Sequence, residues 1–261
     1  MKGFKKKEWM VPGLEVALAL LLIFGYKSAV TEKVGTWSGK VESSVSEKKT
    51  GIKDGKKKGQ REKTGKEEKG EEGEELQEKK IAITFDDGPH PVYTEKLLDG
   101  LKEREVKATF FVLGQNVEKY PEIIERMKEE GHIIGNHTYS HIQLRSTNRQ
   151  QFRDELVLTN ESISGITGQE VQYVRPPYGT WDKKLEEELN MFPVLWNVDP
   201  NDWCTGNADK VTKNIVNKAK ENCIILLHDC YQSSVDAALA SIDILTQEGY
   251  EFVTVEELLF D

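Results

Sequence analysis

From residue 80 onward, short runs rich in β-branched and aromatic residues alternate with stretches that have helical periodicity. This alternation is typical of βα units, in which helices join the strands of a mainly parallel sheet. Strands are predicted at 80–85, 108–113, 133–135, 173–175, 194–197, 223–227 and 251–254. Helices are predicted at 93–104, 121–130, 147–164, 183–190, 210–221 and 234–248.

About seven such repeats are enough to close a (β/α) barrel. Polar residues gather where predicted strands end, at Asp86 and Asp87, at 199–202 and at His228, and barrels of this type carry their active sites at that end. An open, doubly wound sheet would explain the same alternation. The glycine-rich dinucleotide or phosphate motif that would favour the open sheet is missing from the sequence, so an α/β barrel is the preferred prediction.

Residues 1–30 have the pattern of a signal anchor or a signal peptide. Lysines precede an apolar run from Trp9 to Tyr26, which only just approaches the roughly 20 residues that span a bilayer. The small residues that cleavage requires are poorly placed around Ala29, so an uncleaved anchor is favoured. The expected location is the cell membrane, with the C-terminal domain extracytoplasmic, or secreted if the segment is cleaved.

Residues 31–79 are crowded with Lys, Glu, Gly and Ser and contain almost no aliphatic side chains. Such a composition buries too little apolar surface to order the chain. The segment is therefore predicted to be a disordered, charged linker. Binding of anionic wall polymer through Lys56, Lys57 and Lys58 is a minor alternative.

The charge of the chain is unevenly distributed. Residues 80–261 contain 18 basic and 31 acidic side chains, a balance of −13, so that residues 1–79 contribute +4 to the net charge of −9. A domain this acidic repels phosphate backbones, and it has no basic stripe interleaved with aromatic residues. Nucleic acid is excluded as an expected partner.

Three cysteines are too few for a disulfide framework. Cys223 and Cys230 flank a predicted strand, and seven extended residues span roughly 23 Å, which is beyond disulfide reach. Cys204 with Cys230 is the remaining pairing, and three free thiols are at least as well supported.

Two neighbouring carboxylates, Asp86 and Asp87, end the first predicted strand before a Gly-Pro turn. An Asp-Gly turn would account for Asp87 but not for Asp86. The repulsion between two acids is tolerable when one binds a cation and the other remains a base in the cation's field. The sequence thus predicts a metal ligand beside a general base.

His137 and His141 are spaced so that one helical turn would place both imidazoles on the same face. Zinc commonly takes such nitrogen ligands together with a carboxylate and keeps a position for water. Asp87 is the expected third ligand. His90 and His132 lack this context and are assigned structural roles.

Three further segments carry polar residues near predicted strand ends. Each is weak alone, because a rigid proline loop, a turn or a core strand explains it equally well. They are Arg175-Pro-Pro-Tyr178-Gly, Asp199-Pro-Asn-Asp202-Trp203 and Leu226-Leu-His228-Asp.

Together and in this order, the five segments resemble the NodB-homology polysaccharide deacetylases, carbohydrate esterase family 4, over residues 80–261. The resemblance implies a distorted (β/α) barrel. It implies that Asp87, His137 and His141 bind a divalent metal, most readily Zn²⁺, although Co²⁺, Ni²⁺, Mn²⁺ and Fe²⁺ also suit such ligands. Pro200 departs mildly from the family pattern and removes no catalytic group.

The resemblance also implies the other roles. Asp86 would be the general base, paired with Arg175, and His228 the acid, tuned by Asp202. The backbone N–H of Tyr178 would stabilise the oxyanion. Leu226 would line a methyl pocket, and Trp203 would form an aromatic wall for sugar.

The expected function is removal of N-acetyl groups from N-acetylglucosamine units of a cell-wall polysaccharide, with peptidoglycan favoured. An O-acetyl xylan esterase or a chitin-oligomer deacetylase would use the same fold. A non-catalytic glycan-binding wall protein is the alternative from another class.

Overall fold

The structure, a computed structural model, describes residues 79–260. It contains one parallel sheet of seven strands, which are β1 (Lys79–Asp86), β2 (Thr109–Val112), β3 (Ile133–Asn136), β4 (Tyr173–Val174), β5 (Phe192–Pro193), β6 (Ile224–His228) and β7 (Tyr250–Val253). The longer helices are α2 (Tyr93–Glu103), α4 (Pro121–Glu129), α5 (Arg149–Thr167), α6 (Lys183–Leu189), α7 (Ala208–Lys218) and α8 (Gln232–Gln247). The shorter ones are α3 (Gly114–Val117), α9 (Val255–Phe260) and the 3-10 turns η1 (Pro177–Gly179) and η2 (Asp202–Cys204).

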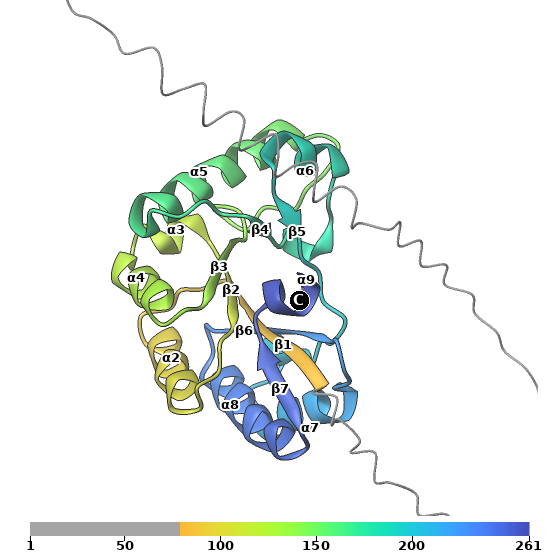
Figure 1. Cartoon of the computed structure of the whole chain (residues 1–261). Helices are drawn as coiled ribbons and strands as arrows, with labels where there is room; N and C mark the ends of the chain where they lie inside the picture. Colours follow the sequence, from red (N-terminus) through yellow and green to blue (C-terminus); the bar gives the residue numbers. More distant parts are fainter. Residues whose placement is uncertain (1–78, 261) are drawn as a thin grey trace, which may run out of the picture. The chain divides into compact units, whose positions relative to one another are not determined.

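The helices surround the curled sheet (Figure 1). The strand order is β5-β4-β3-β2-β1-β6, and β7 pairs with the first half of β1. The segment that follows β5 crosses back to β6, where Val198 bridges Ile225. Within residues 79–260 this is a single bridge and not a ladder. The α/β class and the parallel sheet are therefore confirmed, and the expected barrel is a curled half-barrel.

Successive side chains of each strand point to opposite faces of the sheet, and this creates two hydrophobic layers. On β1, Ile81, Ile83 and Phe85 pack in the layer beneath the helices. Ala82 belongs to a second, interior layer on the opposite face of the strand, because successive side chains of a strand point to opposite sides. The interior layer contains Ala82, Phe111, Tyr173, Val194, Ile224 and Val255.

The same period of two continues up β1 to Asp86. Thr84 and Asp86 share the interior face with Ala82, and the register places Asp86 beside His228 of β6. The interior is thus apolar near the strand beginnings and polar near the strand ends. This gradient positions the candidate site.

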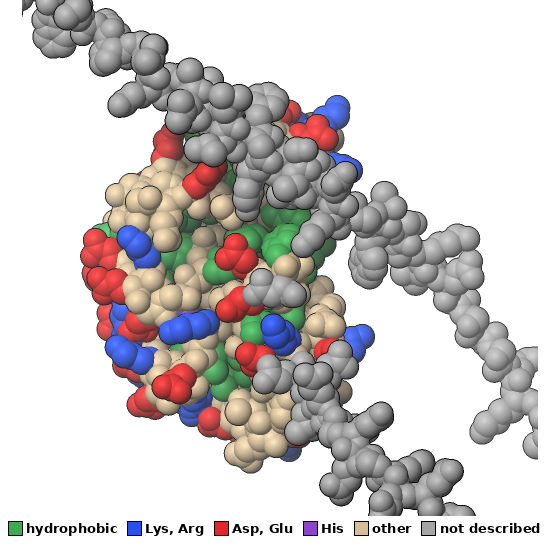
Figure 2. Space-filling view, in the orientation of Figure 1, with side chains coloured by type: hydrophobic (Ala, Val, Ile, Leu, Met, Phe, Trp, Pro, Cys, Tyr) green, Lys and Arg blue, Asp and Glu red, His purple; other side chains and the backbone are tan. Residues whose placement is uncertain are grey.

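The helix α9 covers the beginnings of the strands, facing the viewer in Figure 1. Val255 donates its N–H to Thr109 of β2, and Glu256 accepts a bond from Tyr173 of β4. Figure 2 shows hydrophobic side chains in the middle of this face, among charged groups. Phe192 and Phe260 pack edge to face here, with ring centroids 5.6 Å apart.

Most predicted elements lie within three residues of their observed positions, and β5 is the main exception. The strand predicted at 194–197 is found at 192–193, because residues 194–198 leave β4 to reach β6. The predicted linker ends one residue late, since Lys79 opens β1. The three cysteines are free, so the pairing of Cys204 with Cys230 is not formed.

The signal segment predicted at 1–30 and the linker predicted at 31–79, apart from Lys79, lie outside the described residues. Among the helices of residues 79–260, none is long and apolar enough to cross a membrane.

Candidate metal centre and active site

The end of β1 presents the two adjacent carboxylates to different surroundings. Asp86 is the last residue of the strand and is buried in the interior. Asp87 adopts a φ of 73°, which turns the chain out of the sheet. Its carbonyl oxygen accepts a 2.9 Å bond from the amide of Asn116 at α3. A buried acid and a partly exposed acid therefore stand side by side.

His137 and His141 follow β3, but not on a helix. The segment between them is a loop in which Thr138 and His141 have φ values of 66° and 63°. The helical-turn interpretation of their spacing is wrong. The left-handed residues fold the loop tightly enough to bring the two imidazole centroids within 5.0 Å.

Asp87, His137 and His141 form a group suited to a metal ion. Their ligand atoms all lie within 4.8 Å of one another. Asp87 Oδ1 is 3.4 Å from His137 Nε2 and 3.5 Å from His141 Nε2. The same Oδ1 is buried without a hydrogen-bond partner among the described residues. A carboxylate oxygen aimed at two imidazole nitrogens fits a divalent cation.

The ring of His137 is prepared for this role. Its Nδ1–H donates a 2.6 Å bond to the carbonyl oxygen of Arg175, which leaves Nε2 free for a ligand. Burial lowers the pKa of His137 to about 3, although Asp87 opposes the shift. The imidazole is therefore neutral at pH 7, as a metal ligand requires.

Adding Zn²⁺ or Co²⁺ to the metal-free protein is expected to raise its melting temperature. A cation present at 100 times its Kd stabilises the fold by about 2.7 kcal/mol. His141→Ala should lose most of this response, whereas His132→Gln, which lies outside the group, should retain it. The measurement is thermal unfolding with and without metal. Equal responses in the two variants would contradict the assignment.

Arg175 is fully buried and reaches across the interior of the sheet. Its Nη1 donates to Thr84 Oγ1 at 2.7 Å and to Asp86 Oδ1 at 2.8 Å. Its Nε donates to the carbonyl of Val194 at 3.0 Å. The guanidinium also lies over the ring of Phe111, 4.2 Å from the centroid. Arg175 thus joins β1 to the segment after β5 and fixes the orientation of Asp86.

Two opposing effects act on the pKa of Asp86. Burial raises the pKa, whereas the charge and hydrogen bond of Arg175 lower it, and the net direction is upward. A carboxyl group with a raised pKa is a stronger base once ionised. The lowering of the Asp86 pKa by Arg175 is therefore smaller than the increase caused by burial.

His228 and Asp202 form a second charged pair opposite Asp86. His228 Nδ1 lies 3.0 Å from Asp202 Oδ1, and the backbone N–H of His228 donates to Asp202 Oδ2 at 2.8 Å. Burial lowers the pKa of His228, but Asp202, Asp86 and Asp87 outweigh it and raise the pKa to about 9. The imidazole is accordingly protonated at neutral pH.

The remaining predicted residues occupy different depths of the site. Leu226 is buried two residues before His228 on β6, and it lies beside Thr84 in the register of β1 and β6. Tyr178 is 65% exposed, with a φ of 61°, and its ring meets that of His141 edge to face at 5.1 Å. Trp203 is 56% exposed on η2, next to the buried Asp202. Tyr178 and Trp203 therefore offer exposed aromatic surface near the charged groups.

Sequence reasoning missed two buried polar residues of this region. Thr84 shares Arg175 with Asp86 and donates its hydroxyl hydrogen to the carbonyl of Ile225 at 2.6 Å. Asp229 follows His228 and is 1% exposed. The inward-facing position of Thr84 on β1 was a usable signal. Asp229 had no signal of its own, because an Asp after a strand is ordinary turn chemistry.

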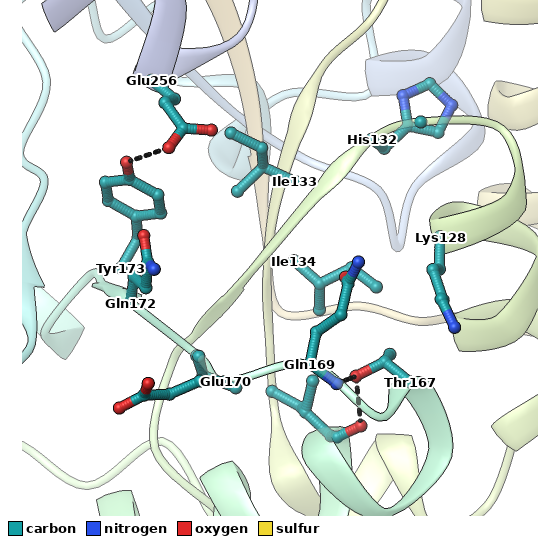
Figure 3. Close-up of a pocket in the computed structure, with 13 residues that line it drawn as sticks. Lys128, His132, Ile133, Ile134, Thr167, Gln169, Glu170, Gln172, Tyr173 and Glu256 are labelled. Atoms are coloured by element: carbon teal, nitrogen blue, oxygen red, sulfur yellow. Dashed lines mark hydrogen bonds between the residues drawn. The ribbon is translucent and has the colours of Figure 1, made fainter. Parts of the chain in front are cut away.

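A cavity of about 500 Å³ lies at the other end of the strands, near the beginnings of β3 and β4 (Figure 3). Its lining includes Lys128, Gln169, Glu170 and Gln172, and the bond between Tyr173 and Glu256 borders it. It contains none of the ten predicted site residues. The cavity is separate from the candidate metal centre.

An Asp-His-His group at the ends of parallel strands, between a buried carboxyl and a protonated imidazole, is the arrangement of a metal-dependent hydrolase. Residues 73–194 match the family model described as polysaccharide deacetylase. The chain belongs to the polysaccharide deacetylase family, as the sequence resemblance predicted.

Several relatives are similar over the described domain. Peptidoglycan-N-acetylmuramic acid deacetylase PdaC of Bacillus subtilis is 42% identical over 188 residues, 72% of this chain and 40% of the relative. A peptidoglycan-N-acetylglucosamine deacetylase of Bacillus cereus is 41% identical over 185 residues, 68% of this chain and 67% of the relative. The chain thus spans about two fifths of the length of PdaC.

The solved structure of peptidoglycan deacetylase PdaC from Bacillus subtilis superposes with a TM-score of 0.67 at 42% identity. The match covers 70% of this chain and 90% of the solved one. The curled parallel sheet is therefore the fold of a deacetylase domain.

Proposed function

We propose that this protein is a metal-dependent deacetylase that removes N-acetyl groups from N-acetylglucosamine units of peptidoglycan. The observation that carries the proposal is the placement of Asp86 beside His228 in the register of β1 and β6. A base and an acid stand there next to a group fit for a metal. The names of the relatives support peptidoglycan as the substrate class.

The metal is held by Asp87, His137 and His141 in this proposal, with Zn²⁺ as the first candidate. A divalent cation held there would supply Lewis-acid chemistry, which brings the pKa of water from about 15.7 to roughly 7. Asp86 takes the proton of the attacking water. Arg175 keeps the Asp86 carboxylate oriented through its 2.8 Å bond.

His228 supplies the proton that the leaving nitrogen needs, because an amine departs only when protonated. Asp202 holds the imidazolium in place through the 3.0 Å contact at Nδ1 and leaves Nε2 to face the substrate. The backbone N–H of Tyr178 stabilises the oxyanion. Leu226 lines the acetyl methyl pocket, and Trp203 provides an aromatic wall for the sugar.

Deacetylation is expected to decline at alkaline pH as His228 loses its proton. The raised pKa keeps the imidazolium present up to about pH 9, and a cation bound at Asp87 makes this value an upper limit. Asp202→Asn removes the partner that raises the pKa, so the decline should move to lower pH. The measurement is kcat/KM against pH, and an unmoved alkaline limb would contradict the role of Asp202.

The location proposed for the enzyme is the outer side of the cell membrane. The apolar run within residues 1–30 supports an anchor, and the charged composition of 31–79 supports a linker that lets residues 80–261 reach the wall. Cell fractionation with and without residues 1–30 tests this. Recovery in the culture medium of a chain that lacks residues 1–30 would favour cleavage and secretion.

The central experiment treats purified peptidoglycan with the full chain and Zn²⁺. Released acetate is measured, and mass spectrometry of the digested glycan locates the new free amines. Amines on glucosamine are the expected result. Amines on muramic acid alone would show that N-acetylmuramic acid, and not N-acetylglucosamine, is the substrate. The absence of released acetate from peptidoglycan, chitin oligomers and acetylated xylan would defeat the proposal.

A further inference from the structure

Asp229 is a buried carboxyl group to which the proposed reaction gives no role. It follows His228 at the end of β6, and its side chain points toward the loop that begins at Asp87. Its Oδ2 accepts a 2.5 Å bond from the hydroxyl of Thr94 at the start of α2. The same hydroxyl accepts a 2.7 Å bond from the N–H of His90. Asp229 is thereby linked to both ends of residues 90–94.

The carboxyl group of Asp229 also lies directly against the backbone of Gly88. A Cβ atom at Gly88 would overlap both carboxylate oxygens of Asp229. Gly88 is the residue after the metal ligand Asp87, so the closest approach occurs one residue away from the candidate metal centre. Glycine at this position is explained by the closeness of Asp229.

The same turn is also held by hydrogen bonds from α3 and from the residue before it. Asn116 donates to the carbonyl oxygen of Asp87, and the N–H of Leu113 donates to the carbonyl oxygen of Gly88 at 3.0 Å. The turn that carries Asp87 is therefore in contact with both the α3 region and Asp229.

Space filling does not explain why this position carries a carboxyl group. Burial of an acid costs free energy that an aliphatic side chain of similar size would avoid. Asp229 Oδ1 has no hydrogen-bond partner among the described residues, which adds to that cost. The carboxyl group accepts the hydrogen bond from Thr94 and packs against Gly88, and an aliphatic side chain could not accept that bond.

We propose that Asp229 is a positioning residue for the metal ligand Asp87. By holding Gly88 and the loop up to Thr94, it keeps Asp87 Oδ1 within reach of both His137 and His141. Groups behind the ligands of a metal typically contribute tenfold to hundredfold to affinity. This inference rests on the metal centre of the proposed function but not on the substrate.

The test measures Co²⁺ and Zn²⁺ affinity of the full chain by competition with a chromophoric chelator. Asp229→Ala is expected to weaken binding by roughly tenfold to hundredfold. Asp229→Asn retains an acceptor for Thr94 and should recover most of the affinity. Thr94→Val, which removes the hydroxyl that joins His90 to Asp229, should lose affinity in the same direction.

A control separates positioning from general destabilisation. Ile242→Ala opens a cavity in the buried face of α8, ten residues after the first residue of that helix, and should lower the melting temperature without changing metal affinity. A loss of affinity in the control equal to that of Asp229→Ala would overturn the inference. Wild-type affinity in Asp229→Ala would do so as well.

A double-mutant cycle tests the contact itself. Gly88→Ala is expected to weaken metal binding in the wild-type background, because the new methyl group meets the Asp229 carboxyl. In the Asp229→Ala background the space is free, so the same change should cost less. Additive effects would contradict a direct contact.

The measurement also distinguishes this inference from the proposed function. If the wild-type chain binds metal tightly but releases no acetate, the deacetylase proposal fails and the role of Asp229 stands. If the wild-type chain binds neither Co²⁺ nor Zn²⁺, the metal centre and the inference fail together.

Discussion

Replacing Arg175 with methionine is expected to lower the free energy of unfolding by about 3–5 kcal/mol, the usual cost of removing one partner from a buried ion pair. Arg175 is fully buried, and its loss leaves the buried carboxyl of Asp86 and the carbonyl of Val194 without their donor. Since domains are stable by only about 5–15 kcal/mol, the variant should be close to unfolding. Urea denaturation of the metal-free protein measures the effect.

The matched control for Arg175 is Arg104→Met. Arg104 makes two bonds to Asp243, at 2.7 and 2.8 Å, but this pair lies at the surface, where water screens the charges. Its removal should cost far less than the removal of Arg175. Similar losses in the two variants would show that the buried network does not govern the stability of the sheet.

Replacing His228 with glutamine is expected to reduce kcat on N-acetylated glycan by roughly 10²–10⁴-fold, the usual contribution of a general acid. Glutamine keeps a polar side chain above Asp202 but cannot deliver a proton to the leaving amine. Metal affinity should remain near that of the wild type, because His228 is not in the Asp-His-His group. Acetate release from peptidoglycan and chelator competition are the two measurements.

An O-acetylated substrate provides the contrast for His228. An alcohol leaves more readily than an amine, so the same variant should lose much less activity on acetylated xylan. Undiminished activity of His228→Gln on the N-acetylated glycan would remove His228 from the mechanism. It would favour an O-acetyl esterase as the function of this protein.

Much of the fold could be predicted because the central elements have strong local patterns. The strands β1 and β6 are apolar runs that end in polar residues, β2 is an apolar run after Thr109, and α4 begins with Pro121. The short strands were harder. β4 and β5 have two residues each, and the chain after β5 changes its partner from β4 to β6 within a few residues. Such a change of partner depends on tertiary pairing, so it produces no alternation of apolar and polar residues in the sequence.

The site was predictable as a set of residues more than as a geometry. The family resemblance paired Arg175 with Asp86 and Asp202 with His228, and both pairings agree with the rule that a buried charge needs a partner. The spacing of His137 and His141 suggested a helix, since periodicity cannot reveal that Thr138 and His141 adopt left-handed conformations. Asp229 was overlooked because its role depends on Gly88 and Thr94, which lie more than 130 residues earlier.

The central position of β1 has a consequence for the way the chain acquires its structure. One neighbour, β2, follows within about thirty residues, but β6 and β7 on the other side lie near the end of the chain. While the chain is being synthesised, one edge of a strongly apolar strand stays without a partner until β6 and β7, more than 130 residues later, have emerged. Unpaired edges of this kind associate with other chains. The newly made protein therefore passes through a stage in which β1 needs protection from aggregation.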